Sequence, residues 1–242
     1  MTGRTLAELG LADTPRDHPL TYPGAWPADS GLLHGDRMLP LERLVYDDRM
    51  PVLAVGSNAC PGHLRYKMAA SGIDAPVPMV RTRVTGLDVG VSGHVSLSGY
   101  ISASPVKSPD SSRELFVIWL DRRQLEVVDA SEPHYWRVAL PAQHVRIELP
   151  DGAVLSDVHA YVNRHGVLRD GCGAPRRHPG QRALLTELLL ESAPLRKLFG
   201  STPEEFVSRV QADPGLSALG TRLFAEQGWL MGSGLEPYAG PS

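Results

Sequence analysis

The feature that most constrains the fold is an almost uninterrupted apolar run, ELFVIWL, at residues 114–120. Such a run is typical of a strand that is buried on both faces, and so of the centre of a sheet. A helix signal follows at once, because Asp121 can cap a helix whose capping-box position holds Gln124. We therefore expect a central strand that leads directly into a helix.

Other segments carry weaker patterns of the same two kinds. Strand patterns occur at residues 52–55, 79–89, 94–104, 134–140, 144–149 and 154–162, and helix patterns at 61–72, 121–132, 181–193 and 201–215. The last helix has Ser201 or Thr202 as its cap and Pro203 in its first turn. Residues 163–180, rich in Gly and Arg, are expected to form a loop. This order predicts an α+β fold, with a mixed sheet interrupted by helices and a helical C-terminus.

The first 50 residues differ from the rest of the chain. They are dense in Pro and Gly and show no sustained period of 2 or 3.6. Tyr22 and Trp26 are nevertheless present, and aromatic residues are scarce in disordered tails. We expect residues 1–50 to be an extended N-terminal arm packed on the core. Residues 51–242 are expected to be a single domain with a C-terminal helical extension.

Composition excludes several classes of function. The formal net charge of −3 provides no basic surface for nucleic acid. No segment approaches the roughly 18 consecutive apolar residues of a membrane helix, and the N-terminus lacks a signal pattern. Cys60 and Cys172 are the two cysteines, and they are far apart in the sequence. A cytoplasmic protein without nucleic-acid or membrane partners is expected, and its oligomeric state is left open.

The first candidate site lies in PVLAVGSNACPGHL, residues 51–64. Gly56, Ser57 and Asn58 separate a short apolar strand from a helix that begins at Pro61. One interpretation is a plain turn. The other is a loop in which Gly56 adopts a positive φ and successive backbone N–H groups hold a carboxylate or an oxyanion. A serine-hydrolase elbow is not indicated, because AVGSNA lacks the second glycine of that motif.

The second candidate is Glu132 in VVDASEPHYWRV. It lies just after a predicted helix and just before a predicted strand, and Pro133 favours an extended conformation for it. Apolar and aromatic neighbours favour a partly desolvated carboxylate, which suits a general base. The alternative is a solvated glutamate in an ordinary helix–strand turn.

The two candidates occur in the order that is typical of the gamma-glutamylcyclotransferase-like family, which this chain resembles over residues 52–162. The family has Tyr-Gly-Ser-Asn after its first core strand, and a glutamate much later, after an apolar strand and a short helix. The corresponding segments here are LAVGSNACPGHL and ELFVIWLDRRQLEVVDASEPHYWRV. The resemblance implies that Val55 and Gly56–Asn58 bind substrate, that Glu132 is the catalytic acid/base, and that Tyr135 matches an aromatic substrate contact. Val55 stands where the family usually has tyrosine, so the loop lacks that hydroxyl.

The resemblance implies cyclisation of an L-γ-glutamyl group to 5-oxoproline. The substrate's α-amine attacks its own side-chain carbonyl and expels an amine or peptide, so neither a cofactor nor a metal is expected. A mixed sheet or small β-barrel with flanking helices is the implied fold. The expected partner is a small-molecule γ-glutamyl substrate, whose leaving amine stays open. A non-catalytic ligand-binding or regulatory protein on the same scaffold, and a related amidase or acyltransferase, are the alternatives.

Several other polar residues are weaker candidates for a site. His94 and His134 are possible pocket residues, while the spacing of His159 and His165 is poor for one metal ion. Cys60 is expected to be a small buried filler. The run Arg176–His178 either meets an acidic substrate or is a solvated loop, and the solvated loop is the favoured interpretation.

Overall fold

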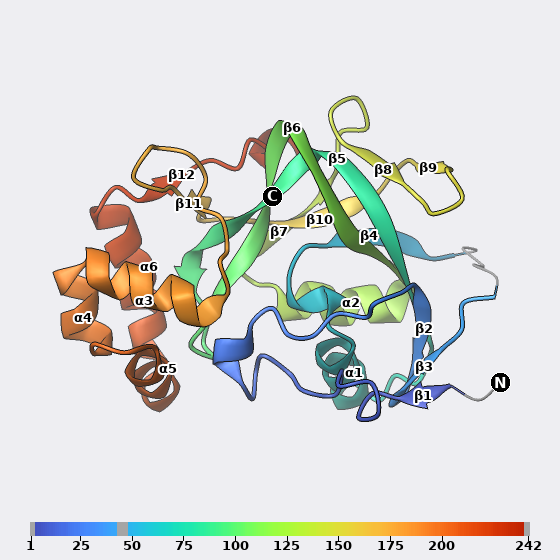
Figure 1. Cartoon of the computed structure of the whole chain (residues 1–242), viewed down its shortest axis with the longest axis horizontal. Helices are drawn as coiled ribbons and strands as arrows, with labels where there is room; N and C mark the ends of the chain where they lie inside the picture. Colours follow the sequence, from blue (N-terminus) through green and yellow to red (C-terminus); the bar gives the residue numbers. More distant parts are fainter. Residues whose placement is uncertain (1–2, 43–47, 240–242) are drawn as a thin grey trace.

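A computed structural model describes residues 3–42 and 48–239. The described residues form twelve strands and six α-helices, so the predicted α+β class is confirmed (Figure 1). The strands are β1 (Arg4–Thr5), β2 (Gly31–His34), β3 (Arg37–Leu39), β4 (Met50–Ala54), β5 (Val77–Val95), β6 (Ile101–Leu120), β7 (Tyr135–Ala139), β8 (Arg146–Glu148), β9 (Val154–Leu155), β10 (His159–Asn163), β11 (Val167–Leu168) and β12 (Leu230–Met231). The α-helices are α1 (Pro61–Ala70), α2 (Arg122–Ser131), α3 (Gln181–Glu191), α4 (Ala193–Phe199), α5 (Pro203–Ala212) and α6 (Gly215–Glu226).

The sheet is mixed and open. Its main path runs β1-β3-β2-β5-β6-β4-β10-β7, with β8, β9, β11 and β12 attached off this path. β10 pairs with β4 in parallel, while the other strand pairs within the described residues are antiparallel. The path does not return to its first strand, so these residues form no closed barrel.

The apolar run that dominates the sequence lies in the middle of this sheet, as predicted. It forms the second half of β6, between β5 and β4. Its side chains alternate between two hydrophobic clusters: Phe116 and Ile118 pack with residues of α1 and α2, and Val117 and Trp119 pack on the opposite face. Burial on both faces explains why the run shows no polar alternation.

Two strand predictions are wrong in their boundaries. The predicted strand 94–104 is interrupted, because β5 and β6 form one long hairpin whose turn lies between Val95 and Ile101. Gly99, with φ +87°, provides the left-handed residue of that turn. The predicted strand 154–162 is likewise split into β9 and β10, and Asp157 between them has φ +57°. In each case apolar residues on both sides of a tight turn produced one continuous strand pattern.

The helix signals agree with the structure where they are local. Asp121 and Gln124 form the predicted capping box of α2. Thr202, rather than Ser201, caps α5, where Glu205 completes a second capping box. Helices α4 and α6 were not predicted.

The helices occupy two regions of the molecule (Figure 1). α1 and α2 pack beside the sheet near β4, and α3–α6 gather at the turn end of the β5–β6 hairpin. Ser217 and Thr221 of α6 bond to the backbone O and N–H of Val95, which ties α6 to that end.

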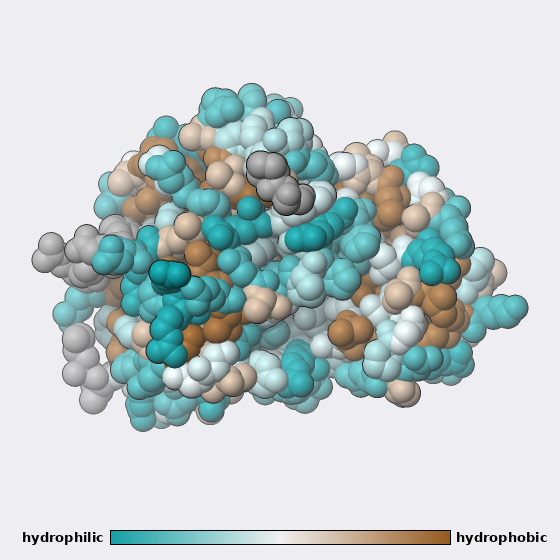
Figure 2. Space-filling view, turned by 180° about the vertical axis from the view of Figure 1, so that it is seen from behind, coloured by the Kyte–Doolittle hydropathy of each residue, from teal (hydrophilic) through white to brown (hydrophobic). Residues whose placement is uncertain are grey.

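The N-terminal residues contribute to the same sheet. β2 pairs with β3 and with β5, and the residues between β1 and β2 include the buried side chains of Leu6 and Tyr22. On the face shown in Figure 2, hydrophobic side chains reach the surface in separate patches between hydrophilic ones. No helix within residues 3–42 and 48–239 has the length and hydropathy needed to cross a bilayer.

Candidate active site

A pocket of about 290 Å³ opens where β4, α1, the α2–β7 junction and the tip of the β5–β6 hairpin meet. All of the site residues proposed from the sequence line it: Val55, Gly56, Ser57, Asn58, Glu132 and Tyr135. His94 and His134 also line it, as the sequence suggested. The pocket therefore brings together residues from the two candidate motifs.

The loop after β4 has a different conformation from the one expected. Gly56 has φ −143°, so the expected positive φ is wrong. A Cβ at Gly56 would instead overlap the hydroxyl of Tyr22. Glycine is needed here because the Tyr22 side chain comes close to the backbone of residue 56. A left-handed backbone conformation is not the reason for the glycine.

The loop that lines the pocket contains backbone N–H groups with no acceptor in the described part of the chain. Gly56 and Ser57 use their carbonyl oxygens, which accept from Ala59 N–H and Cys60 N–H, both at 3.0 Å. Within the described residues, the N–H groups of Gly56, Ser57 and Asn58 donate to no acceptor. Unpaired N–H groups beside a pocket are suited to binding an anionic oxygen.

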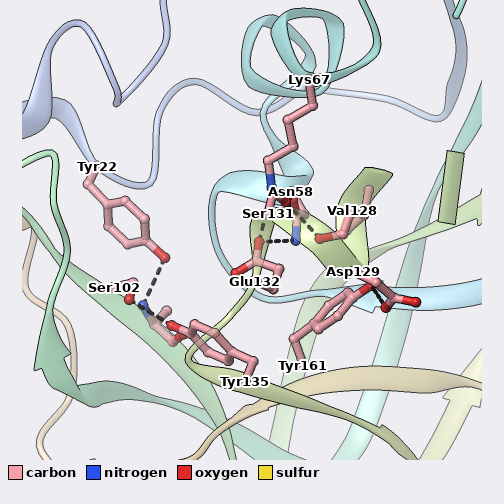
Figure 3. Close-up of polar contacts among 11 residues, drawn as sticks. Tyr22, Asn58, Lys67, Ser102, Val128, Asp129, Ser131, Glu132, Tyr135 and Tyr161 are labelled. Atoms are coloured by element: carbon pink, nitrogen blue, oxygen red, sulfur yellow. Dashed lines mark hydrogen bonds and ion pairs between the residues drawn. The ribbon is translucent and has the colours of Figure 1, made fainter. Parts of the chain in front are cut away.

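Glu132 ends α2 and points at the loop (Figure 3). Its Oε1 accepts from Asn58 Nδ2 at 3.1 Å and from Lys67 Nζ at 3.0 Å. Lys67 Nζ also donates to Asn58 Oδ1 at 2.8 Å, which closes a three-residue network. The Glu132 side chain is 16% exposed and that of Lys67 is 8% exposed, so this ion pair is largely desolvated. These contacts do not agree with the alternative interpretation of Glu132 as a solvated glutamate in a turn.

The role of Lys67 was missed in the sequence. It lies on α1 three residues after the buried Leu64, and that spacing places both on the inward side of the helix. This spacing was the available signal, but a single lysine in a helix is ordinarily solvated.

Tyr135 forms part of the pocket wall, and its hydroxyl is engaged by β5 and β6. Its Oη lies 2.6 Å from Ser102 Oγ and 2.9 Å from Ser92 Oγ, and it donates to Ala103 O at 3.1 Å. Burial, followed by the nearby Glu132 carboxylate, raises the pKa of Tyr135 above its ordinary value. Tyr135 is therefore a neutral, fixed phenol.

A second tyrosine reaches the pocket from the N-terminal residues. Tyr22 Oη accepts the N–H of Ala103 at 2.8 Å, and its ring stacks on Tyr100 with 4.6 Å between centroids. Figure 3 shows its hydroxyl directed at the strand that carries Ser102. This contact could not be predicted from the sequence, because Tyr22 lies in a segment without periodicity.

Three histidine rings lie close together: those of His94 and His134 line the pocket, and that of His165 lies beside them. The ring centroids of His94 and His134 are 4.7 Å apart, and those of His134 and His165 are 5.5 Å apart. Asn163 Nδ2 lies 2.8 Å from His94 Nδ1. Burial, followed by His134 and His165, lowers the pKa of His94 to about 3. No group of His, Cys, Asp or Glu side chains within the described ranges is arranged to hold a metal ion.

We expect the protein to lose stability in mild acid because of two buried histidines. Burial also lowers the pKa of His63 to about 3. Between about pH 3 and 6.5 the unfolded chain therefore binds protons that the folded chain does not, so stability falls as the pH drops through this range. Each histidine contributes roughly 1–2 kcal/mol to this loss at pH 5. Denaturant unfolding at pH 7 and pH 5 measures this loss in the free energy of unfolding. The difference between the two pH values should be smaller in His94→Gln. Equal stability of the wild type at both pH values would contradict the expectation.

The remaining sequence candidates lie outside the pocket or have a structural role. Cys60 is fully buried, as expected of a filler. Arg176 forms ion pairs with Glu187 and Glu191 of α3, so it is not a solvated loop residue and does not line the pocket. His159 and His165 do not share a site.

Comparison with known proteins returns no matching family model and no matching curated protein. Several solved structures are partly similar. One is described as a gamma-glutamyl cyclotransferase: the match has 13% identity and a TM-score of 0.38, and spans 48% of this chain and 66% of that one, just under two thirds. An Arabidopsis thaliana protein matches with 16% identity and a TM-score of 0.36, over 63% of this chain and 89% of that one. YkqA from Bacillus subtilis matches with 15% identity and a TM-score of 0.38, over 69% of this chain and 55% of that one. These similarities are distant and partial, so function is inferred below from the pocket.

Proposed function

We propose that this protein cyclises an L-γ-glutamyl group to 5-oxoproline and releases an amine or peptide. The observation that carries the proposal is the contact between Asn58 of the loop and Glu132 at the end of α2. These residues are 74 positions apart in the sequence and hydrogen-bond at 3.1 Å in one pocket. A donor-rich loop and a partly buried carboxylate are the two groups that this reaction requires.

The reaction needs a base, and the geometry of Glu132 suits that role. Oε1 is held by Asn58 and Lys67, whereas Oε2 accepts no hydrogen bond within the described residues. Oε2 is therefore available to take a proton from the substrate's α-ammonium group. The freed amine attacks the γ-carbonyl carbon, and the C–N bond to the leaving group breaks as Glu132 returns the proton to the departing nitrogen. The attacking nitrogen loses its second proton as the lactam forms, and this proton passes through Glu132 to the released amine, which leaves as an ammonium ion. Such proton transfer contributes about 10²–10⁴-fold to a rate.

The loop supplies the other requirement. Gly56 and Ser57 line the pocket, and their N–H groups have no acceptor among residues 3–42 and 48–239, so these donors would stabilise the oxyanion that forms at the γ-carbonyl. One such donor is worth about 3 kcal/mol in the transition state. Holding the glutamyl chain in a folded conformation beside them lowers the entropic cost of ring closure.

Lys67 would make the site tolerant of an anionic substrate. An isolated Glu132 carboxylate would repel the α-carboxylate of a glutamyl group, and the Lys67 ammonium 3.0 Å away balances that charge. The ion pair also fixes the carboxylate in one orientation, which favours repeated proton transfer at Oε2.

The direct test is incubation of the purified protein with a broad panel of γ-glutamyl amines, amino acids and peptides, with detection of the products. Release of 5-oxoproline from at least one compound is the expected result. Release of free glutamate instead would indicate an amidase, in which water replaces the internal amine. Failure to convert any compound would contradict the proposed reaction.

One observation favours a second candidate function, a non-catalytic ligand-binding protein. The Glu132 carboxylate is already held by Lys67 at 3.0 Å and by Asn58 at 3.1 Å, and these contacts can position the loop for binding without any proton transfer. The two functions differ in what a ligand does. A binding protein should be stabilised thermally by a γ-glutamyl compound that it leaves intact, whereas the enzyme should release product.

A further inference from the structure

Tyr22 is placed where it can touch a ligand in the pocket. Tyr22 is 4% exposed, and it lines the pocket together with Gly56 and Glu132. Its hydroxyl lies so close to Gly56 that no side chain larger than hydrogen fits there without displacement. The phenol therefore lies directly beside the loop whose N–H groups donate to no acceptor among the described residues.

The hydroxyl of Tyr22 has a proton to donate. Its oxygen accepts the N–H of Ala103 at 2.8 Å, and among residues 3–42 and 48–239 the hydroxyl donates to no acceptor. Tyr135 differs, because its hydroxyl already donates to Ala103 O. Burial, followed by Tyr135, raises the pKa of Tyr22 well above its ordinary value, so the donor stays protonated. A buried donor without an acceptor is costly unless a ligand or water satisfies it.

The position of Tyr22 is fixed from two sides. The ring stacks on Tyr100 at 4.6 Å and also lies 5.6 Å from the ring of His178, measured between centroids. A phenol held in this way loses little further freedom when a ligand binds, so its hydrogen bond contributes more fully to affinity.

A glutamyl ligand brings a carboxylate that needs such donors. The Lys67 ammonium is already engaged by Glu132 Oε1 and Asn58 Oδ1. Hydroxyl and N–H donors are then left for the ligand at the other side of the pocket, where Tyr22 lies next to Gly56. Hydrogen bonds from neutral donors to a carboxylate are among the stronger ones in proteins.

We propose that Tyr22, supplied by the N-terminal residues, is a specificity-determining residue that donates its hydroxyl proton to the α-carboxylate of the ligand beside Gly56. The inference rests on the proposed function for the identity of that ligand. It assigns to the residues before β2 a direct part in binding, although they lie outside the segment that resembles a known family. It also places a tyrosine hydroxyl beside the loop in which Val55 lacks one.

The test uses the full chain, the variant Tyr22→Phe and two probes, 5-oxo-L-proline and its neutral amide. Phenylalanine keeps the ring and its stacking on Tyr100, so only the hydroxyl is lost. We expect the Kd for 5-oxo-L-proline, measured by calorimetry, to rise about 10- to 100-fold. The Kd for the amide should change by less than about threefold. With a γ-glutamyl substrate, KM should rise while kcat stays nearly constant, because the contact is made in the ground state as well.

Tyr238→Phe is the matched control, because it removes a phenol hydroxyl in the C-terminal segment outside the pocket. It should leave both Kd values unchanged. An unchanged Kd for 5-oxo-L-proline in a folded Tyr22→Phe protein would overturn the inference. Equal weakening of the acid and the amide would also overturn it, since a purely structural role affects both. If the wild type releases no 5-oxoproline, only the proposed reaction is contradicted, and the Kd for 5-oxo-L-proline still decides the role of Tyr22. If the wild type binds neither probe, the proposed role of Tyr22 is overturned as well.

Discussion

Replacing Glu132 by glutamine should lower kcat by about 10²–10⁴-fold and leave KM nearly unchanged. The amide keeps the size of the side chain, and its oxygen can still accept from Asn58 Nδ2 and Lys67 Nζ. It cannot take a proton from an ammonium group, so the loss appears in the chemical step. Initial rates of 5-oxoproline release, measured over a range of concentrations of a substrate found in the panel, separate kcat from KM.

The matched control is Glu126→Gln, the same change on the same helix at an exposed ion pair with Arg122. It should leave turnover within experimental error of the wild type. Removing the charge leaves Lys67 without its anionic partner, which could destabilise the fold. Circular dichroism would therefore be used to establish that Glu132→Gln is folded. A folded Glu132→Gln protein with wild-type kcat would exclude Glu132 as the base.

Replacing Gly56 by alanine should abolish binding of 5-oxoproline and destabilise the protein by about 1–3 kcal/mol. The added methyl group would overlap the hydroxyl of Tyr22, whose ring is held against Tyr100. Either the ring or the loop must move, and the hydrogen bond from Ala103 N–H to Tyr22 is then strained or lost. Denaturant unfolding measures the change in stability, and calorimetry measures the change in affinity.

A double substitution isolates the cause of that effect. In Gly56→Ala with Tyr22→Phe the overlapping hydroxyl is gone, and the nearest ring atom is Cζ, 3.3 Å from the new methyl group. The two changes should therefore be less destabilising together than the sum of their separate effects. Gly171→Ala is the control for the substitution itself, because an added Cβ meets nothing within 4 Å there. Strict additivity of the two changes would show that Gly56 is not constrained by Tyr22.

The parts of the fold that could be predicted depend on neighbours in sequence. The Asp121–Gln124 capping box spans three positions, and the burial of residues 115–120 follows from their own composition. The turn between Val95 and Ile101 was missed, since apolar residues flank it on both sides and a period of two continues across it. Local patterns identify elements well and place their ends poorly when both flanks are buried.

The site was predictable only in part, for the same physical reason. The proximity of Asn58 and Glu132 was expected from the order of two motifs, and neither residue indicates it alone. Lys67 and Tyr22 enter the pocket through contacts with residues far along the chain: Lys67 with Glu132, 65 positions away, and Tyr22 with Ala103, 81 positions away. The spacing of Lys67 from Leu64 is a weak local signal, and nothing around Tyr22 distinguishes it from the other residues of an irregular segment. The predicted conformation of Gly56 was wrong. Glycine is required at this position because the Tyr22 hydroxyl lies against it, and only the folded chain brings Tyr22 near.

The last four residues of β5 connect the wall of the pocket with the hydrophobic cluster formed by α3–α6. Val95 packs in the hydrophobic cluster formed with α3–α6, while Ser92 contacts Tyr135 and His94 lines the pocket. Because α6 holds the backbone of Val95, we expect that loosening these helices would also disturb the adjacent wall of the pocket. We therefore expect ligand affinity and the docking of α3–α6 to be thermodynamically linked, and such a coupling acts in both directions. A bound ligand should slow amide hydrogen exchange in α6, although no residue of that helix lines the pocket.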